Sequence, residues 1–294
     1  MLPYLVLAGG VLVASTASIL IRLAQAEGVA SLTIAAMRMG LAALILLPFA
    51  WPRLRAEVPR LAPRHLRLAL ISGLCLAIHF WSWITSLAYT SVASSTVLVT
   101  TNPIWVGLAS LLILRERLPA AGIAGILLSI AGTGLIFMAD AHSDAATPHS
   151  APALGNSLAL VGAISASTYL LIGRGLRAHL GLLSYIWLAY ATAAVLLWIG
   201  VAASGAHVLG FSAFAYLVLL ALAIGPQLLG HTAFNWSLRH LSATFVALSI
   251  LGEPVGSALL AYLIFGEKLT ALQLAGFALI LTGIFVAARA EGRR

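Results

Sequence analysis

The sequence predicts an all-α integral membrane protein in which ten transmembrane helices form two inverted five-helix repeats around a central cavity. Three observations predict this fold. The 294 residues are 62% hydrophobic and only 8% charged, which is more apolar than an ordinary globular domain. Apolar blocks of about 20 residues recur from end to end, and each is long enough to cross a bilayer as a helix. The second half of the chain repeats the first.

The predicted spans are apolar windows separated by charged residues, prolines or glycines. In chain order they lie at residues 4–24, 30–51, 66–89, 92–114, 119–138, 154–173, 182–203, 211–236, 242–265 and 269–289. The first window contains small residues like those at signal-peptide cleavage sites, but no Lys or Arg precedes it, so we interpret it as a retained helix. Cys75 is the only cysteine, so the sequence offers no internal disulfide and no thiolate metal site.

Basic residues test the number of spans, because Lys and Arg accumulate in short loops on the cytoplasmic side. With the N-terminus in the cytoplasm, ten spans leave only Arg22 and Lys268 on the opposite side. The cytoplasmic loops and tail then hold Arg53, Arg55, Arg60, Arg64, Arg67, Arg115, Arg117, Arg174, Arg177, Arg239, Arg289, Arg293 and Arg294. We therefore expect both termini in the cytoplasm. This topology and attraction to anionic lipid explain the formal charge of +8 without a nucleic-acid partner.

The duplication is clearest when TTNPIWVGLASLLILRERL, from Thr100, is aligned with LGEPVGSALLAYLIFGEKL, from Leu251. The offset of 151 places Asn102 on Glu253, Pro103 on Pro254, Glu116 on Glu267, Gly125 on Gly276 and Gly132 on Gly283. The front of each half agrees at an offset of 152, where the letters AST at 14–16 match AST at 166–168.

Each half contains five predicted spans, which is an odd number, so the second copy enters the membrane from the opposite side. The predicted units are a first repeat at 1–140, an extracytoplasmic linker at 141–153 and an inverted second repeat at 154–294. Inverted repeats are a recurring build of secondary transporters, whose site lies near the midplane between the halves.

The paired motifs, NP followed by LILRERL and EP followed by LIFGEKL, resemble the duplicated signature of the drug/metabolite transporter superfamily, in its EamA-type ten-helix form. Arg38 resembles an arginine that such proteins often carry in their second helix. The aromatic-rich third span is similar to that of bacterial exporters of aromatic amino acids. The resemblance implies a basket of ten helices, a cavity walled mainly by spans 1, 3, 4, 6, 8 and 9, and export of small metabolites from the cytoplasm.

Arg38 and Glu253 are the charged residues predicted at bilayer depth, where an ionisable group costs about 2.5–3.5 kcal/mol on insertion scales. Pro254 lacks an N–H, so the carbonyl of Ile250 loses its helical donor. Glu253 either lines the pathway, meeting a substrate ammonium or carrying a proton, or clamps backbone N–H groups of a facing helix. The sequence favours a structural use of Arg38, by snorkelling or local pairing, and offers no obvious carboxylate partner.

Other polar residues in the spans share helix faces with aromatic or polar neighbours. His79 precedes Trp83 by four residues in the third span, and His231 precedes Asn235 by four in the eighth, so each pair lies on one face. Such a face suits an aromatic ligand with polar ends, although a histidine can also be a satisfied interior group. The predicted pathway residues are His79, Trp83, Asn102, Ser165, Tyr169, His231, Asn235, Ser249 and Glu253.

Prolines and glycines in the predicted spans are expected to allow helix bending and close helix packing. The X-Pro steps at Pro103, Pro226 and Pro254 are predicted flex points for opening one side while the other closes. Two glycine pairs spaced by seven residues keep a small side chain on one helix face and are predicted to allow close helix packing. They are Gly125 with Gly132 and Gly276 with Gly283.

These expectations combine into an inner-membrane exporter of small metabolites, with amino acids and especially aromatic ones as the favoured substrates. Export of drugs or other metabolites is the nearest alternative, and an intramembrane enzyme or a scaffold protein is a distant one. The sequence contains no HExxH motif, no pair of spanning aspartates and no Ser/His pair with an orienting third group. We expect no metal or other cofactor, and the oligomeric state is left open.

Overall fold

The computed structural model describes residues 1–90, 92–112, 119–141, 151–265 and 270–291, and within these ranges the chain forms helices and no strand. Most of the predicted linker, residues 142–150, and the loop residues Glu116 and Glu267 lie outside the described part. The first half contains α1 (Leu2–Ala14), α2 (Ala17–Ala26), α3 (Ser31–Glu57), the 3-10 turn η1 (Val58–Arg60), α4 (Pro63–Ser86), α5 (Val92–Val99), α6 (Asn102–Leu112) and α7 (Ala120–Ala141).

The second half follows the loop between α7 and α8. It contains α8 (Pro152–Leu176), α9 (Leu182–Ser204), α10 (Ala213–Leu222), the π-helix η2 (Ala223–His231), α11 (Thr232–Ser237), α12 (Ala243–Ile250), α13 (Gly252–Phe265) and α14 (Ala271–Glu291). Seven described segments are long and apolar enough to cross a membrane, and shorter apolar stretches lie at Ala120–Leu135 and Leu274–Val286. The remaining predicted span is present as α5 and α6. The prediction of a ten-helix membrane fold is confirmed.

Three spans that the sequence predicts as continuous are broken near their middle, and a fourth is locally widened. Span 1 breaks at Ser15 and Thr16, whose hydroxyls donate to the carbonyls of Val11 and Val13. Span 4 breaks at Thr100 and Thr101, whose hydroxyls also donate to carbonyls of the preceding turn. Such back-bonding competes with the helical ladder and bends helices.

Proline explains the other irregularities. In spans 4 and 9 the chain resumes its helix with Pro103 and Pro254 in the first turn of α6 and α13, where the missing N–H needs no partner. In span 8, Pro226 lies inside the π-helix η2. A π segment accommodates a residue that cannot donate the regular hydrogen bond.

The crossing of α7 with α14 shows directly that the halves are inverted. A Cβ atom added to Gly132 would lie 2.5 Å from the carbonyl oxygen of Gly276, and one added to Gly283 would lie 2.6 Å from that of Gly125. The earlier glycine of α7, Gly125, thus contacts the later glycine of α14, Gly283, and the later one of α7 contacts the earlier one of α14. The two helices are therefore antiparallel. Exchanging each glycine for its repeat partner, Gly125 for Gly276 and Gly132 for Gly283, converts one contact into the other. The two halves are therefore related by a twofold pseudo-axis.

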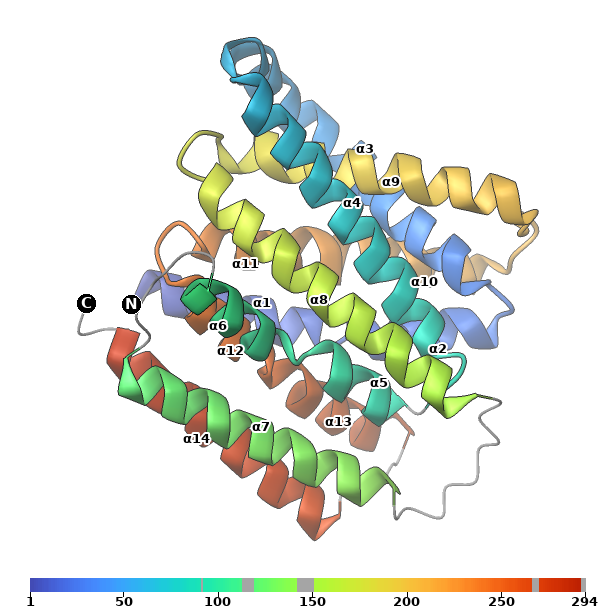
Figure 1. Ribbon diagram of the computed structural model, residues 1–294. Helices are drawn as coiled ribbons and strands as arrows, with labels where there is room; N and C mark the ends of the chain where they lie inside the picture. Colours follow the sequence, from blue (N-terminus) through green and yellow to red (C-terminus); the bar gives the residue numbers. More distant parts are fainter. Residues whose placement is uncertain (91, 113–118, 142–150, 266–269, 292–294) are drawn as a thin grey trace.

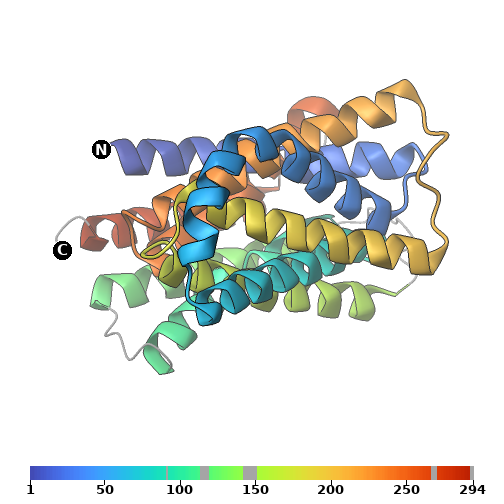
Figure 2. The same ribbon diagram turned by 90° about the horizontal axis from the view of Figure 1, so that it is seen from above.

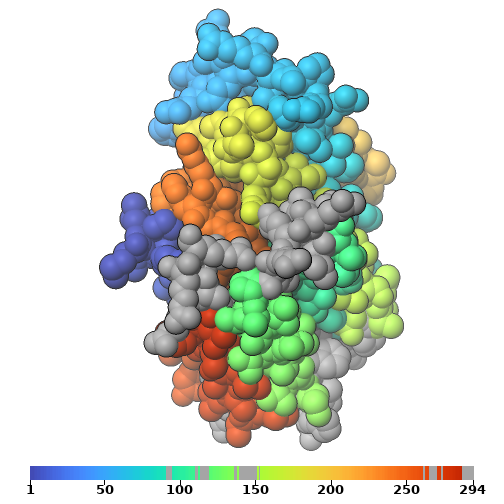
Figure 3. Space-filling view, turned by 60° about the vertical axis from the view of Figure 1, so that its left-hand side comes forward, coloured from blue at the N-terminus to red at the C-terminus, as the bar shows by residue number. Residues whose placement is uncertain are grey.

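Other helix pairs follow the same symmetry. Helix α4 packs against α8, and the equivalent helices of the other half, η2 with α11, pack against α1. Helices α3 and α9, which are repeat partners, lie together at one edge of the bundle, and α7 and α14 lie together at the other (Figure 1). Helix α1 begins and α14 ends at the same end of the bundle (Figures 1 and 2). The space-filling view shows α7 and α14 side by side near that end (Figure 3).

Candidate functional site

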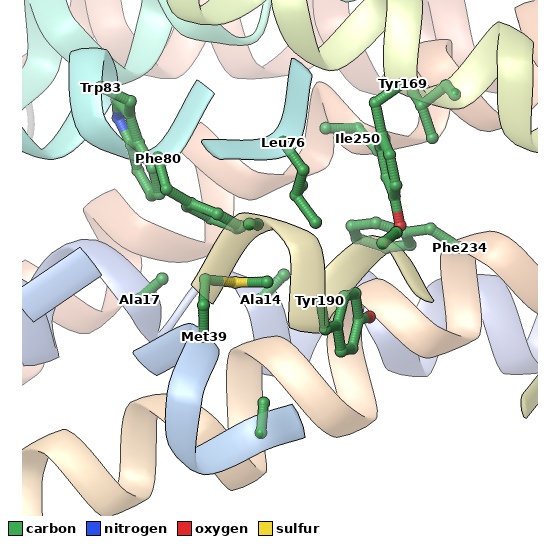
Figure 4. Close-up of a cluster of buried hydrophobic side chains, with 14 of the residues drawn as sticks. Ala14, Ala17, Met39, Leu76, Phe80, Trp83, Tyr169, Tyr190, Phe234 and Ile250 are labelled. Carbon is green, nitrogen blue, oxygen red and sulfur yellow. The ribbon is translucent and has the colours of Figure 1, made fainter. Parts of the chain in front are cut away.

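A cavity lies in the middle of the bundle, between the two halves. About 530 Å³ of space outside the protein atoms lies within it, a figure that includes solvent at its opening. Figure 4 shows part of its apolar lining, with Trp83 towards the left, Tyr169 and Phe234 towards the right, and Leu76 between them. The lining residues are Ala14, Ala17, Arg38, Leu76, His79, Trp83, Val99, Thr100, Asn102, Ala166, Tyr169, Leu170, His231, Phe234, Ile250 and Glu253.

The cavity lies on the twofold pseudo-axis, because much of its lining consists of repeat partners. At the offset of 152 that relates the front of the halves, Ala14 pairs with Ala166 and His79 with His231. At the offset of 151 that relates their ends, Asn102 pairs with Glu253. The cavity is therefore the space that the inverted duplication creates, rather than a gap within one half.

Each irregular span also contributes to the cavity at its irregular point. Ala14 and Ala17 flank the break in span 1, Thr100 and Asn102 belong to the break in span 4, and His231 ends the π-helix. Backbone that departs from the helix at membrane depth is tolerated where it is buried in protein or lines a wet cavity. The helix breaks therefore occur at the points where these spans line the cavity.

Aromatic rings form one wall. The rings of His79 and Trp83 are stacked with centroids 5.8 Å apart, and the His79 and His231 rings lie 6.3 Å apart. The Nδ1 atom of His79 is 3.0 Å from the carbonyl oxygen of Gly162. Since a carbonyl only accepts, Nδ1 carries the hydrogen, and Nε2 of the neutral ring is an acceptor. The indole Nε1–H of Trp83 is buried and has no acceptor among the described residues.

Arg38 reaches this cavity from α3 and is only 1% exposed, so of the two structural uses expected, snorkelling does not occur and pairing within the protein does. Its Nε donates to Oε1 of Gln227 over 2.9 Å, and its Cζ lies 4.1 Å from the centroid of the Phe80 ring. Nη1 is buried without a partner in the described part of the chain. The sequence offered the signal, an arginine at bilayer depth, but span 2 was expected to be peripheral to the cavity.

Glu253 lies in the first turn of α13, directly after the break in span 9, and faces the same cavity. A carboxylate is favoured near a helix N-terminus by the helix dipole. Within the described ranges Glu253 makes no hydrogen bond and no ion pair, with Arg38 or with any other residue. For the clamp to a facing backbone, which the sequence left open, the described residues supply no partner.

The comparison with known proteins agrees with this architecture. The model of the EamA-like transporter family matches residues 1–138 and again 153–289. The chain belongs to the EamA-like transporter family. The resemblance found in the paired motifs is thereby confirmed, and the protein is a multi-pass membrane protein that transports small molecules.

Relatives of this EamA-like protein are also transporters by name. An uncharacterized transporter of Clostridium kluyveri is 25% identical over 246 residues, which are 83% of this chain and 79% of that protein. The uncharacterized transporter YetK of Bacillus subtilis is 31% identical over 96 residues, and this match spans 33% of the chain and 28% of the relative. A solved crystal structure with 21% identity superposes with a TM-score of 0.74, covers 99% and 98% of the two chains, and supports the fold alone.

The predicted pathway residues divide into two groups in this EamA-like fold. His79, Trp83, Asn102, Tyr169, His231 and Glu253 line the cavity, whereas Ser165, Asn235 and Ser249 do not. Asn235 lies directly behind the lining, where its Nδ2 donates to the hydroxyl of Tyr169. Ser249 donates to the carbonyl of Phe245 in its own helix over 2.9 Å. Among the described residues, no three His, Cys, Asp or Glu side chains are grouped so as to hold a metal ion.

Proposed function

We propose that this transporter exports amino acids from the cytoplasm, with a preference for aromatic side chains, by alternating access to the central cavity. The proposed site comprises His79, Trp83, Asn102, Tyr169, His231 and Glu253, joined by Arg38 and positioned in part by Asn235. The proposed location is a bacterial-type inner membrane with both termini in the cytoplasm. The fact that α1 begins and α14 ends at one end of the bundle supports the paired placement of the termini.

The observation that carries the substrate class is the composition of the cavity lining. Trp83, Tyr169 and Phe234 supply aromatic surface, and Nε2 of His79 supplies an acceptor next to it that no described residue donates to. Aromatic ligands gain from offset-stacked and edge-to-face contacts, and their polar ends need hydrogen-bond partners. A cavity lined only by aliphatic residues would not favour aromatic over aliphatic amino acids.

The irregular spans suggest how the cavity opens and closes. Pro103, Pro226 and Pro254 lie at or beside the discontinuities, and each of these discontinuities touches the cavity. Short segments on either side of such a point can tilt without dismantling a whole helix. Rocking of one half against the other about the pseudo-axis would then expose the same site to each side of the membrane in turn.

Flux through the purified protein tests this function. Proteoliposomes preloaded with unlabelled phenylalanine should accumulate labelled phenylalanine by exchange, faster than labelled leucine, whereas protein-free liposomes should not. The panel should also contain lipophilic cationic dyes, because drug export is the nearest alternative. Uptake of the dyes without uptake of any amino acid would reject the proposed substrate class.

A further inference from the structure

Two residues give the cavity its charges. Among the described residues that line it, Arg38 carries the fixed positive charge and Glu253 the carboxylate. An unpaired charge at bilayer depth costs free energy, so both groups call for a partner of opposite sign. In the described chain the two do not reach each other in a direct ion pair, although they share one cavity. The space between them is therefore bounded by opposite charges.

Both residues depart from the symmetry of the lining. The repeat partner of Glu253 is Asn102, at an offset of 151, and the partner of Arg38 at an offset of 152 is Tyr190. Elsewhere in the lining, Ala14–Ala166 and His79–His231 are identical across the pseudo-axis, whereas Ala17 pairs with Tyr169. A symmetric wall cannot select one orientation of a solute with two different ends. The departures at Arg38 and Glu253 are the charged ones, and they give the cavity one positive and one negative side.

The guanidinium of Arg38 is fixed in orientation before any ligand arrives. Gln227, which is fully buried, accepts from Nε, and the Phe80 ring covers one face of the guanidinium plane. These contacts leave Nη1 buried and without an acceptor in the described structure. A buried donor with no partner is costly, and a carboxylate is the ligand that matches an arginine fork best.

Glu253 offers the complementary group. Its carboxylate accepts no hydrogen bond from the described residues. Glu253 lies in the first turn of α13, beside the break in span 9. An ammonium group carries three donors and a full positive charge, so it can satisfy both carboxylate oxygens. The aromatic wall of Trp83 and Tyr169 bounds the same space and would contact the side chain of such a ligand.

We infer that Arg38 binds the carboxylate and Glu253 the ammonium of a zwitterionic α-amino acid, so that both charges of the substrate are required for recognition. This inference rests on the proposed function and specifies its substrate class. It separates free amino acids from aromatic amines, aromatic acids and lipophilic cations, all of which would share the aromatic wall.

Ligand analogues test the inference on the unaltered protein. Binding to the full-length protein in lipid nanodiscs is measured by calorimetry for phenylalanine, for phenylethylamine, which lacks the carboxylate, and for phenylpropanoate, which lacks the ammonium. Each analogue should bind at least about tenfold more weakly than phenylalanine, because it leaves one buried charge unpaired. Binding of either analogue as tight as that of phenylalanine would overturn the inference.

Two substitutions assign the charges to the residues. Glu253→Gln should weaken phenylalanine binding by about tenfold or more and leave phenylpropanoate binding unchanged or tighter. Arg38→Gln should weaken phenylalanine similarly and spare phenylethylamine. The matched control is Glu27→Gln, because Glu27 lies outside the cavity, where it accepts a hydrogen bond from Ser212. This control should change no affinity.

The outcomes separate the inference from the proposed function. If Glu253→Gln weakens phenylalanine and phenylpropanoate by the same factor, the assignment of the ammonium to Glu253 is wrong, while amino acid export stands. If the unaltered protein carries no amino acid in the flux assay, the proposed function fails first and the inference falls with it. If Arg38→Gln does not fold, the analogue series and Glu253→Gln decide without it.

Discussion

Trp83→Ala is expected to lower phenylalanine uptake into proteoliposomes by about tenfold or more, because it removes the largest aromatic surface of the cavity wall. Trp83 is 5% exposed and stacks on His79, so its loss also removes the support of a second lining ring. Initial rates should be measured at equal amounts of folded protein, determined by gel filtration. Leucine uptake should fall less than phenylalanine uptake.

Trp81→Ala is the matched control for this substitution. Trp81 lies two residues earlier in the same helix but is 49% exposed on the outer face of the bundle. Its loss should change uptake by less than about twofold, since surface substitutions away from a site have small effects. If Trp81→Ala and Trp83→Ala reduce uptake equally, or if neither does, the aromatic wall is not the substrate site.

Gly132→Ala should prevent normal packing of α7 on α14 and sharply reduce the amount of folded protein. The added Cβ would lie 2.5 Å from the carbonyl oxygen of Gly276 and 3.0 Å from the backbone nitrogen of Ile280, and neither is the end of a flexible side chain. Overpacking in a well-packed interior costs about 1–3 kcal/mol, and a backbone obstruction lies at the upper end. Thermal unfolding in detergent, followed by gel filtration, measures the effect.

Gly134→Ala provides the comparison within the same helix. A Cβ at this position meets nothing within 4 Å, so only the helix propensity changes, in favour of alanine by about 1 kcal/mol. The Gly134 variant should unfold at the same or a higher temperature than the unaltered protein. If both variants lose the same stability, the claim that Gly132 is needed for the close packing of α7 on α14 is contradicted.

The sequence predicted the architecture well because the relevant signals are local or periodic. Apolar windows identify the spans, and the constant offset between Asn102-Pro103 and Glu253-Pro254 identifies the duplication. An odd number of spans in each half then requires inversion. The same offsets also explain why His79 and His231 come together, since repeat partners on either side of a pseudo-axis face one cavity.

The helix breaks and the role of span 2 were harder to predict. A Ser-Thr or Thr-Thr pair in an apolar helix can bond to its own backbone without ending the helix, so Ser15 and Thr100 gave no unambiguous signal. Arg38 depends on a contact with Gln227, which is 189 residues away in the chain, and no local pattern reveals such a pairing. Ser249 shows the converse, because the sequence predicts it in the pathway, whereas in the structure it is absent from the cavity lining and donates to the carbonyl of Phe245.

The central claim is that the space between the two inverted halves is the wet site where substrate binds, and cysteine accessibility tests it most directly. In a Cys75→Ala background, Ala166→Cys places a thiol on the cavity lining, whereas Ile164→Cys places one on the 43% exposed outer face of the same helix. A charged thiol reagent should label only the first variant, since thiolates do not form in lipid, and phenylalanine should slow that labelling. If Ala166→Cys is as unreactive as Ile164→Cys, or if no transported amino acid protects it, the claim is contradicted.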